Sequence, residues 1–116
     1  MLKVFGFLSR KAGMETQAFI DHYEKNHVPL ILSLATAPTV YKRNYLVKGH
    51  ALNLDDGTTT FDCVTELVFP DRAAFQAWMS DLSRPGVGEQ VAADEARFLD
   101  RSKTRAFVIE EHNTSG

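Results

Sequence analysis

The order in which two kinds of apolar periodicity alternate is the feature of this chain that most constrains its fold. Residues 3–8, 41–47, 61–69 and 105–110 are short runs with the composition or the alternation typical of β-strands. Residues 15–36 and 71–98 instead repeat apolar side chains at helical spacing. With right-handed crossovers, this order predicts an α+β, ferredoxin-like β-α-β-β-α-β domain, in which a four-stranded antiparallel sheet carries the helices on one face.

Both helical regions contain an interruption. Pro29 removes a backbone donor and disfavours helix at the residue before it, so we expect one helix over about 15–26, a joint at His27-Val28 and a second helix over 29–36. Asp71 is the expected N-cap of the later region, which residues 84–86 (Arg-Pro-Gly) divide before 87–98 resumes. The 116 residues correspond to a single domain, with a flexible tail from about 112 to 116.

The third strand predicts a homodimer. Its alternation places the side chains of Phe61, Cys63, Thr65, Leu67 and Phe69 on one face. The opposite face also carries apolar side chains, those of Val64 and Val68. Because the helices cover one sheet face, the other needs a second cover, and a second copy of the sheet is the simplest source.

The charge and cysteine content exclude several classes of partner. A net charge of −2, from 13 basic and 15 acidic residues, lacks the basic surplus that nucleic acid or an anionic membrane would require. The single cysteine, Cys63, excludes an internal disulfide and is expected to be a buried spacer. The N-terminal apolar stretch, Val4 to Leu8, is far too short for a signal peptide or a membrane span. We therefore predict a cytoplasmic protein.

Three polar side chains of the first helical region are candidates for a functional site. His27 follows Tyr23 by one helical turn, so its ring is expected to point inward, where an imidazole could transfer a proton near neutral pH. The alternative is a core histidine bonded to the carbonyl of Lys25, which Pro29 leaves without its helical donor. Tyr23 could bond a substrate oxygen or could simply pack in the core. His22 lies about 100° from Tyr23 around the helix axis. It is a candidate substrate contact, and the alternative is a solvated or capping residue.

Two carboxylates of the third strand are further candidates. Asp62 and Glu66 share one face and lie roughly 13 Å apart, too far for a directly coupled pair. Glu66, flanked by Val64 and Val68, is the third catalytic candidate, and Asp62 is a candidate substrate contact. Each needs a partner if buried, and Arg43 on the neighbouring strand could serve one of them or orient a substrate. Structural ion pairing is the alternative for both carboxylates.

Aromatic side chains supply candidate walls for a pocket. Phe75, Trp78 and Met79 form a helical stripe that is usually core but could line an aromatic-binding site. Tyr41 and Tyr45 have the same two interpretations. The histidines show no HxH or HExxH spacing, and the chain has no glycine-rich phosphate loop, so we expect no metal and no nucleotide cofactor.

Four runs of the sequence resemble EthD-type proteins of the dimeric α/β-barrel superfamily. They are KVFGFLSRKAGMETQAFIDHYEKNHVPL, KRNYLV, FDCVTELVF and EARFLDRSKTRAFVIEEH, and together they span nearly the whole chain. In that family a strand and a basic Gly-Met turn precede a helix that ends in a histidine followed by a small apolar residue and Pro-Leu; here that histidine is His27. The resemblance implies two ferredoxin-like subunits whose sheets meet in a barrel, each with a cleft between sheet and helices.

The resemblance leaves the activity open, because a fold hosts many functions. Its members include an accessory protein of ether degradation and cofactor-free decarboxylases, dehydratases and cyclases that act on aromatic or polyketide-derived substrates. Our leading hypothesis is a cofactor-independent lyase that decarboxylates or dehydrates a small aromatic or polyketide-like substrate, with His27 as the proton-transfer group. The alternatives are a non-catalytic binding protein that shields an intermediate for a partner oxygenase, and a cofactor-free monooxygenase.

Overall fold

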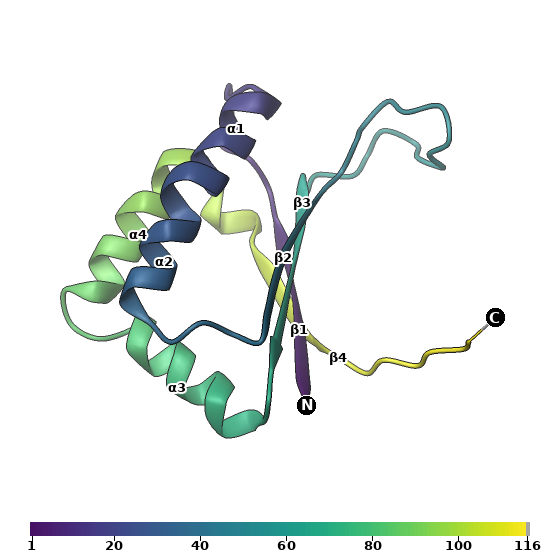
Figure 1. The fold of residues 1–116 in the computed structure, drawn as a ribbon. Helices are drawn as coiled ribbons and strands as arrows, with labels where there is room; N and C mark the ends of the chain where they lie inside the picture. Colours follow the sequence, from purple (N-terminus) through teal and green to yellow (C-terminus); the bar gives the residue numbers. More distant parts are fainter. Residues whose placement is uncertain (116) are drawn as a thin grey trace.

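A computed structural model describes residues 1–115 and contains the predicted order of elements (Figure 1). The strands are β1 (Leu2–Leu8), β2 (Val40–Tyr45), β3 (Cys63–Phe69) and β4 (Arg105–Ile109). The helical elements are α1 (Thr16–His22), the π-helical turn η1 (Tyr23–His27), α2 (Val28–Leu34), α3 (Arg72–Leu82), α4 (Val87–Phe98) and the 3-10 turn η2 (Arg101–Lys103).

The four strands form one antiparallel sheet in the order β2-β3-β1-β4. The helices lie together on one face of this sheet, as Figure 1 shows with the sheet seen nearly edge-on. This arrangement confirms the predicted α+β, ferredoxin-like fold. Within residues 1–115 no helix is long and apolar enough to cross a membrane.

Two apolar clusters fill the space between the sheet and the helices. Their buried members are Phe19, Tyr23, Val28, Cys63, Phe98 and Leu99 in the first cluster and Ile31, Phe69 and Trp78 in the second. Cys63, Thr65, Leu67 and Phe69 thus share the helix-facing side of β3, as alternation predicted. Phe61 does not, because it precedes β3 and its ring packs on Phe7 of the other face, with centroids 5.3 Å apart. Met79 of the predicted aromatic stripe is 50% exposed, because one residue beyond Trp78 a helix has turned by about 100° towards solvent.

The predicted joint at His27-Val28 is wrong: the helix continues from α1 through η1 into α2. The backbone N–H of Val28 donates to the carbonyl of Tyr23, five residues earlier, which is the π-helical pattern. In a regular α-helix the ring of Pro29 would clash with the carbonyl of Lys25. We attribute the widened turn to Pro29, because it relieves this clash without ending the helix.

The predicted helix boundaries of the later region, residues 71–98, are confirmed. The side chain of Asp71 accepts a hydrogen bond of 2.8 Å from the backbone N–H of Ala74 and caps α3. Gly86 precedes α4 with a φ of 84°, a left-handed value that favours glycine. α3 and α4 therefore pack as two separate helices on the same sheet face.

The sheet face that points away from the helices, here called the outer face, is rich in apolar side chains. Directly opposite residues of neighbouring strands share a face, so the register assigns to it Lys3, Phe5, Phe7, Val40, Lys42, Asn44, Val64, Glu66, Val68, Arg105, Phe107 and Ile109. Phe107 is 57% exposed. Figure 1 also shows that residues 46–62 and the segment after β4 extend on the outer side of the sheet.

We expect the outer face to form a homodimer interface. Light scattering at micromolar concentration should give twice the 13.0 kDa mass of one chain. Phe107→Glu should produce a monomer, because it places a charge on the apolar outer face. Met79→Glu is the matched control, since Met79 is equally accessible but lies on α3. A wild-type monomer, or a Phe107→Glu dimer, would contradict this assembly.

Candidate functional site

A cavity of about 170 Å³ lies between the sheet and the helices. Every strand except β4 and each of the helices α2, α3 and α4 contributes to its wall, together with η1. The lining residues are Gly6, Leu8, Tyr23, His27, Ile31, Tyr41, Thr65, Leu67, Trp78, Leu82, Val91, Glu95 and Leu99. The cavity therefore occupies the position predicted from the sequence.

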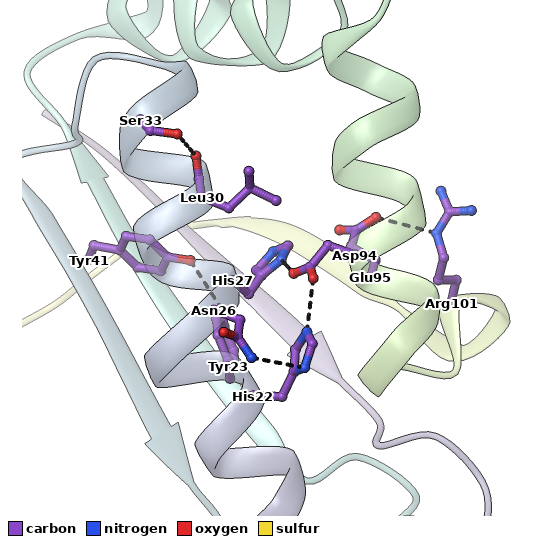
Figure 2. Close-up of polar contacts among 10 residues, drawn as sticks. All are labelled: His22, Tyr23, Asn26, His27, Leu30, Ser33, Tyr41, Asp94, Glu95 and Arg101. Atoms are coloured by element: carbon purple, nitrogen blue, oxygen red, sulfur yellow. Dashed lines mark hydrogen bonds and ion pairs between the residues drawn. The ribbon is translucent and has the colours of Figure 1, made fainter.

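His27 is the imidazole of this cavity wall, and Asp94 of α4 holds it in place. The ring nitrogen Nδ1 lies 2.8 Å from Asp94 Oδ2, and the His27 side chain is 7% exposed (Figure 2). The expected bond to the carbonyl of Lys25 does not form, because the π turn places the ring against α4 instead. Among residues 1–115, Nε2 has no hydrogen-bond partner, so it is the nitrogen left for a ligand.

His22 binds the same carboxylate from the end of α1. Its Nε2 lies 3.0 Å from Asp94 Oδ1, and its ring stacks on Phe98 at a centroid distance of 4.8 Å. Burial acts to raise the pKa of the Asp94 carboxyl, but the hydrogen bonds with His27 and His22 outweigh burial and lower it. Asp94 is therefore ionised at neutral pH. His22 itself does not line the cavity.

Two phenol groups and a hydroxyl form a second polar part of the cavity wall, next to His27. Tyr23 Oη lies 2.7 Å from Thr65 Oγ1, and Tyr41 Oη donates to Tyr23 Oη over 3.5 Å. Burial raises the pKa of Tyr23 well above its ordinary value and also raises the pKa of Tyr41. Both phenols are thus protonated at neutral pH and act as neutral hydrogen-bonding groups.

The remaining wall of the cavity is mostly apolar. Trp78 contributes its ring and is 6% exposed, whereas Phe75 packs on Phe69 behind it and does not reach the cavity. Glu95 is the one carboxylate among the lining residues, and its Oε1 lies 3.3 Å from Arg101 Nε. Apolar cavities of about 150 Å³ accommodate benzene. A ligand of one ring therefore matches the size of this cavity.

Arg43 and Tyr45 bind Glu24 of η1 rather than the cavity. Arg43 Nη2 and Nε lie 2.6 and 2.9 Å from the two carboxylate oxygens of Glu24, and Tyr45 Oη also donates to that carboxylate. The hydrogen bonds from Arg43 lower the pKa of Glu24. Since neither Arg43 nor Tyr45 lines the cavity, both predicted substrate contacts are placed in an ion-pair cluster that joins β2 to η1.

The two carboxylates predicted on β3 also lie outside the cavity. Asp62 precedes the strand and binds the backbone N–H of Arg10 at 2.8 Å and Lys48 Nζ at 3.0 Å. Glu66 lies on the outer face, 3.7 Å from Lys3 Nζ, with the sheet between it and His27. The predicted pairing of Arg43 with one of these carboxylates does not form. Of the three catalytic candidates, only His27 and Tyr23 meet in the cavity.

Sequence reasoning overlooked three residues of the site: Asp94, Thr65 and Glu95. Asp94 lies between Val91 and Phe98 in the apolar register of α4, and Thr65 lies on the buried face of β3. A polar side chain in a buried register must find a polar partner. The sequence shows a polar residue in an apolar register at both positions, but it does not specify the polar partner. His27 and Asp94, for example, are 67 residues apart in the chain.

Direct contact leaves no space for a metal ion between the imidazoles and Asp94, which are separated by 2.8 and 3.0 Å. Within residues 1–115, no group of three or more His, Cys, Asp or Glu side chains is arranged to hold a metal ion. The pair of His27 and Asp94 is instead arranged for proton transfer, with an oriented imidazole beside a carboxylate.

Residues 11–102 match the model of the EthD domain. No curated protein matches the chain significantly.

Solved structures share the fold along nearly the whole chain. A member of the ethyl tert-butyl ether d (EthD) family from Bacillus halodurans has a TM-score of 0.64 and 21% identity, over 97% of this chain and 100% of that one. An Arabidopsis thaliana protein has a TM-score of 0.67 and 14% identity, over 99% of both chains. A dimeric protein of unknown function with a ferredoxin-like fold, from Bacteroides fragilis, has a TM-score of 0.57 and 8% identity, over 95% of both chains.

We expect the thiol of Cys63 to be unreactive in the folded protein. Cys63 is 0% exposed, and burial raises the pKa of its thiol to about 11. Alkylation by iodoacetamide at about pH 8 should therefore be on the order of 100-fold slower than in guanidinium chloride. Mass spectrometry over time measures both rates. Similar rates in the two conditions would show an accessible thiol and would make Cys63 a candidate nucleophile.

Proposed function

The chain belongs to the EthD domain family, and on that premise we propose that it is a cofactor-independent lyase for a one-ring aromatic or polyketide-like substrate. In this proposal the substrate binds in the cavity between the sheet and the helices. His27 transfers the proton, Asp94 orients His27, and the phenols of Tyr23 and Tyr41 hold a substrate oxygen. Each subunit of the expected homodimer then has one such cavity.

The pairing of His27 with Asp94 is the observation that carries this proposal. An ionised carboxylate only accepts hydrogen bonds, so the nitrogen that faces it, Nδ1, carries the proton of a neutral imidazole. Nε2 then has a free electron pair at the cavity wall. A carboxylate behind the ring also stabilises the imidazolium that forms when Nε2 accepts a proton. This is the arrangement of a general base.

Of the two lyase reactions predicted, dehydration fits this tautomer better. A base first removes a proton from the carbon next to a substrate carbonyl, and the imidazolium then returns that proton to the leaving hydroxyl, which departs as water. Decarboxylation instead needs an imidazolium at the outset, to protonate the carbon that loses CO₂. We favour dehydration of a β-hydroxy ketone or a related polyketide-like compound, because that reaction uses the neutral form of His27, in which Nε2 is the nitrogen free to accept a proton.

Tyr41 and Tyr23 support the same reaction. Negative charge develops on the carbonyl oxygen when the neighbouring carbon loses its proton, and a neutral phenol beside that oxygen stabilises the charge. The hydrogen bond of 3.5 Å between the two phenol oxygens is long and therefore weak. Tyr41 can thus donate its hydrogen bond to a substrate oxygen instead, at a small cost in free energy. The apolar rings of the wall, such as Trp78, exclude water and favour a planar ligand.

The competing function is that of a binding protein that shields a reactive intermediate for a partner oxygenase. The same cavity would serve it, since a mostly apolar site between the sheet and the helices limits the contact of a bound ligand with water. The two functions differ in turnover. Catalytic loss of water from a β-hydroxy ketone supports the lyase, whereas stoichiometric binding without turnover across a panel of phenolic acids and β-hydroxy ketones supports the shielding function.

His27→Ala should lower kcat by about two orders of magnitude while the protein stays folded, because it removes the proton-transfer group. His27→Gln should lower kcat as much, since an amide can still donate to Asp94 but cannot accept and return a proton. Turnover of the active substrate and the thermal midpoint are measured together for each variant.

The matched control is His112→Gln, because His112 is an exposed residue of the C-terminal tail. It should change neither kcat nor the thermal midpoint. If His27→Gln keeps a near-native kcat, or loses activity only in proportion to its unfolded fraction, His27 is a structural residue and the lyase proposal fails.

A further inference from the structure

Asp94 accepts hydrogen bonds from two imidazoles, one on each carboxylate oxygen. His27 Nδ1 lies 2.8 Å from Oδ2, and His22 Nε2 lies 3.0 Å from Oδ1 (Figure 2). Because an ionised carboxylate cannot donate, both facing nitrogens carry protons. One carboxylate thus determines which nitrogen is protonated on two rings at once.

Asn26 completes the assignment for His22. Its Nδ2 lies 3.4 Å from His22 Nδ1, and an amide nitrogen donates, so Nδ1 is the acceptor and carries no proton. His22 is then a neutral imidazole protonated on Nε2, which is the opposite tautomer to that of His27. Asn26 thus donates to His22, and His22 donates to Asp94. Asp94 also accepts the hydrogen bond of His27.

His22 is held in place, although it does not reach the cavity. Its ring stacks on the buried ring of Phe98 with an angle of 28° between their planes, and its side chain is 15% exposed. The contact with Asp94 therefore has a fixed direction. Since His22 does not line the cavity, the hydrogen-bond donor on its Nε2 acts on a ligand through Asp94 and His27.

Asp94 needs such a contact because it also lines a groove of about 520 Å³ between α4 and the segment formed by η1 and α2. Lys25 and Arg97 line the same groove and carry cationic donors. If Oδ1 were unoccupied, these donors or water could bind it and rotate the carboxylate. The donor of His22 occupies Oδ1 and leaves Oδ2 directed at His27.

We propose that His22 is a positioning residue, which acts through Asp94 so that the neutral His27 ring carries its proton on Nδ1 and offers Nε2 as the acceptor. The kinetic consequence of this inference rests on the proposed lyase function, but the tautomer of His27 does not. Loss of the His22 donor frees the carboxylate and lets His27 exchange between its two tautomers. A smaller fraction of the protein molecules then has a His27 Nε2 that can accept a proton.

The tautomers are measured by long-range ¹H–¹⁵N correlation spectra of ¹⁵N-labelled protein. In the wild type, His27 should be protonated on Nδ1 and His22 on Nε2. This observation needs no variant, and the opposite assignment of either ring would overturn the inference.

Two substitutions of His22 test the role of its donor. His22→Phe keeps an aromatic ring on Phe98 but removes the donor, and it should raise the minor tautomer of His27 about tenfold. His22→Gln restores a donor to Asp94 and should return His27 towards the wild-type tautomer. An unchanged tautomer in His22→Phe, or no rescue by His22→Gln, would contradict the positioning role.

Kinetics separate this inference from the proposed function. With an active substrate, His22→Phe should lower kcat about tenfold at an unchanged KM, because the donor does not touch the ligand. If the tautomer shifts but no substrate is turned over, the lyase function fails and the positioning role stands. If turnover depends on His27 but His22→Phe alters neither the tautomer nor kcat, the positioning role fails.

Discussion

The partly buried carboxylate of Asp94 is the constraint on which the arrangement of the site depends. An ionised group inside a protein is costly unless hydrogen bonds replace its hydration, and Asp94 obtains them from His27 and His22. These bonds join the end of α1 and the turn η1 to α4 across the apolar ring of Phe98. The same contacts that satisfy the charge therefore set the distance between the helices and orient the imidazole at the cavity wall.

The cavity lies beside this pair, between the sheet and the helices. Gly6 on β1 has no side chain to fill it, and an added Cβ there would meet only Thr65, at 3.9 Å. The π turn that Pro29 induces keeps His27 and Tyr23 close, with ring centroids 5.6 Å apart. A cavity large enough for one aromatic ring thus adjoins the oriented imidazole of His27 and two phenols. These groups are sufficient for proton transfer without a covalent intermediate.

The sequence was sufficient to predict the fold because each element has a clear periodicity and each boundary has a chemical cause, such as the cap at Asp71. It also located His27 and Tyr23, which follow an apolar helical register. The sequence did not predict the positions of Arg43 and Glu66 correctly. A strand pattern separates the two faces of a sheet, but it does not show which helix residue packs against each face. Arg43 forms an ion pair with Glu24, and Glu66 lies on the outer face of the sheet. Asp94 could not be paired with His27 from the sequence, since only tertiary packing brings α4 against η1.

The central claim is that a ligand binds in the cavity beside His27, and the most direct measurement detects where a bound ring lies. In protein labelled on the methyl groups of Ile, Leu and Val, phenol in excess serves as the probe. The account predicts intermolecular nuclear Overhauser effects from the phenol ring to Ile31, Leu67 and Val91, which line the cavity. Effects confined to Val64 and Ile109 on the outer face, or none at the cavity, would contradict it.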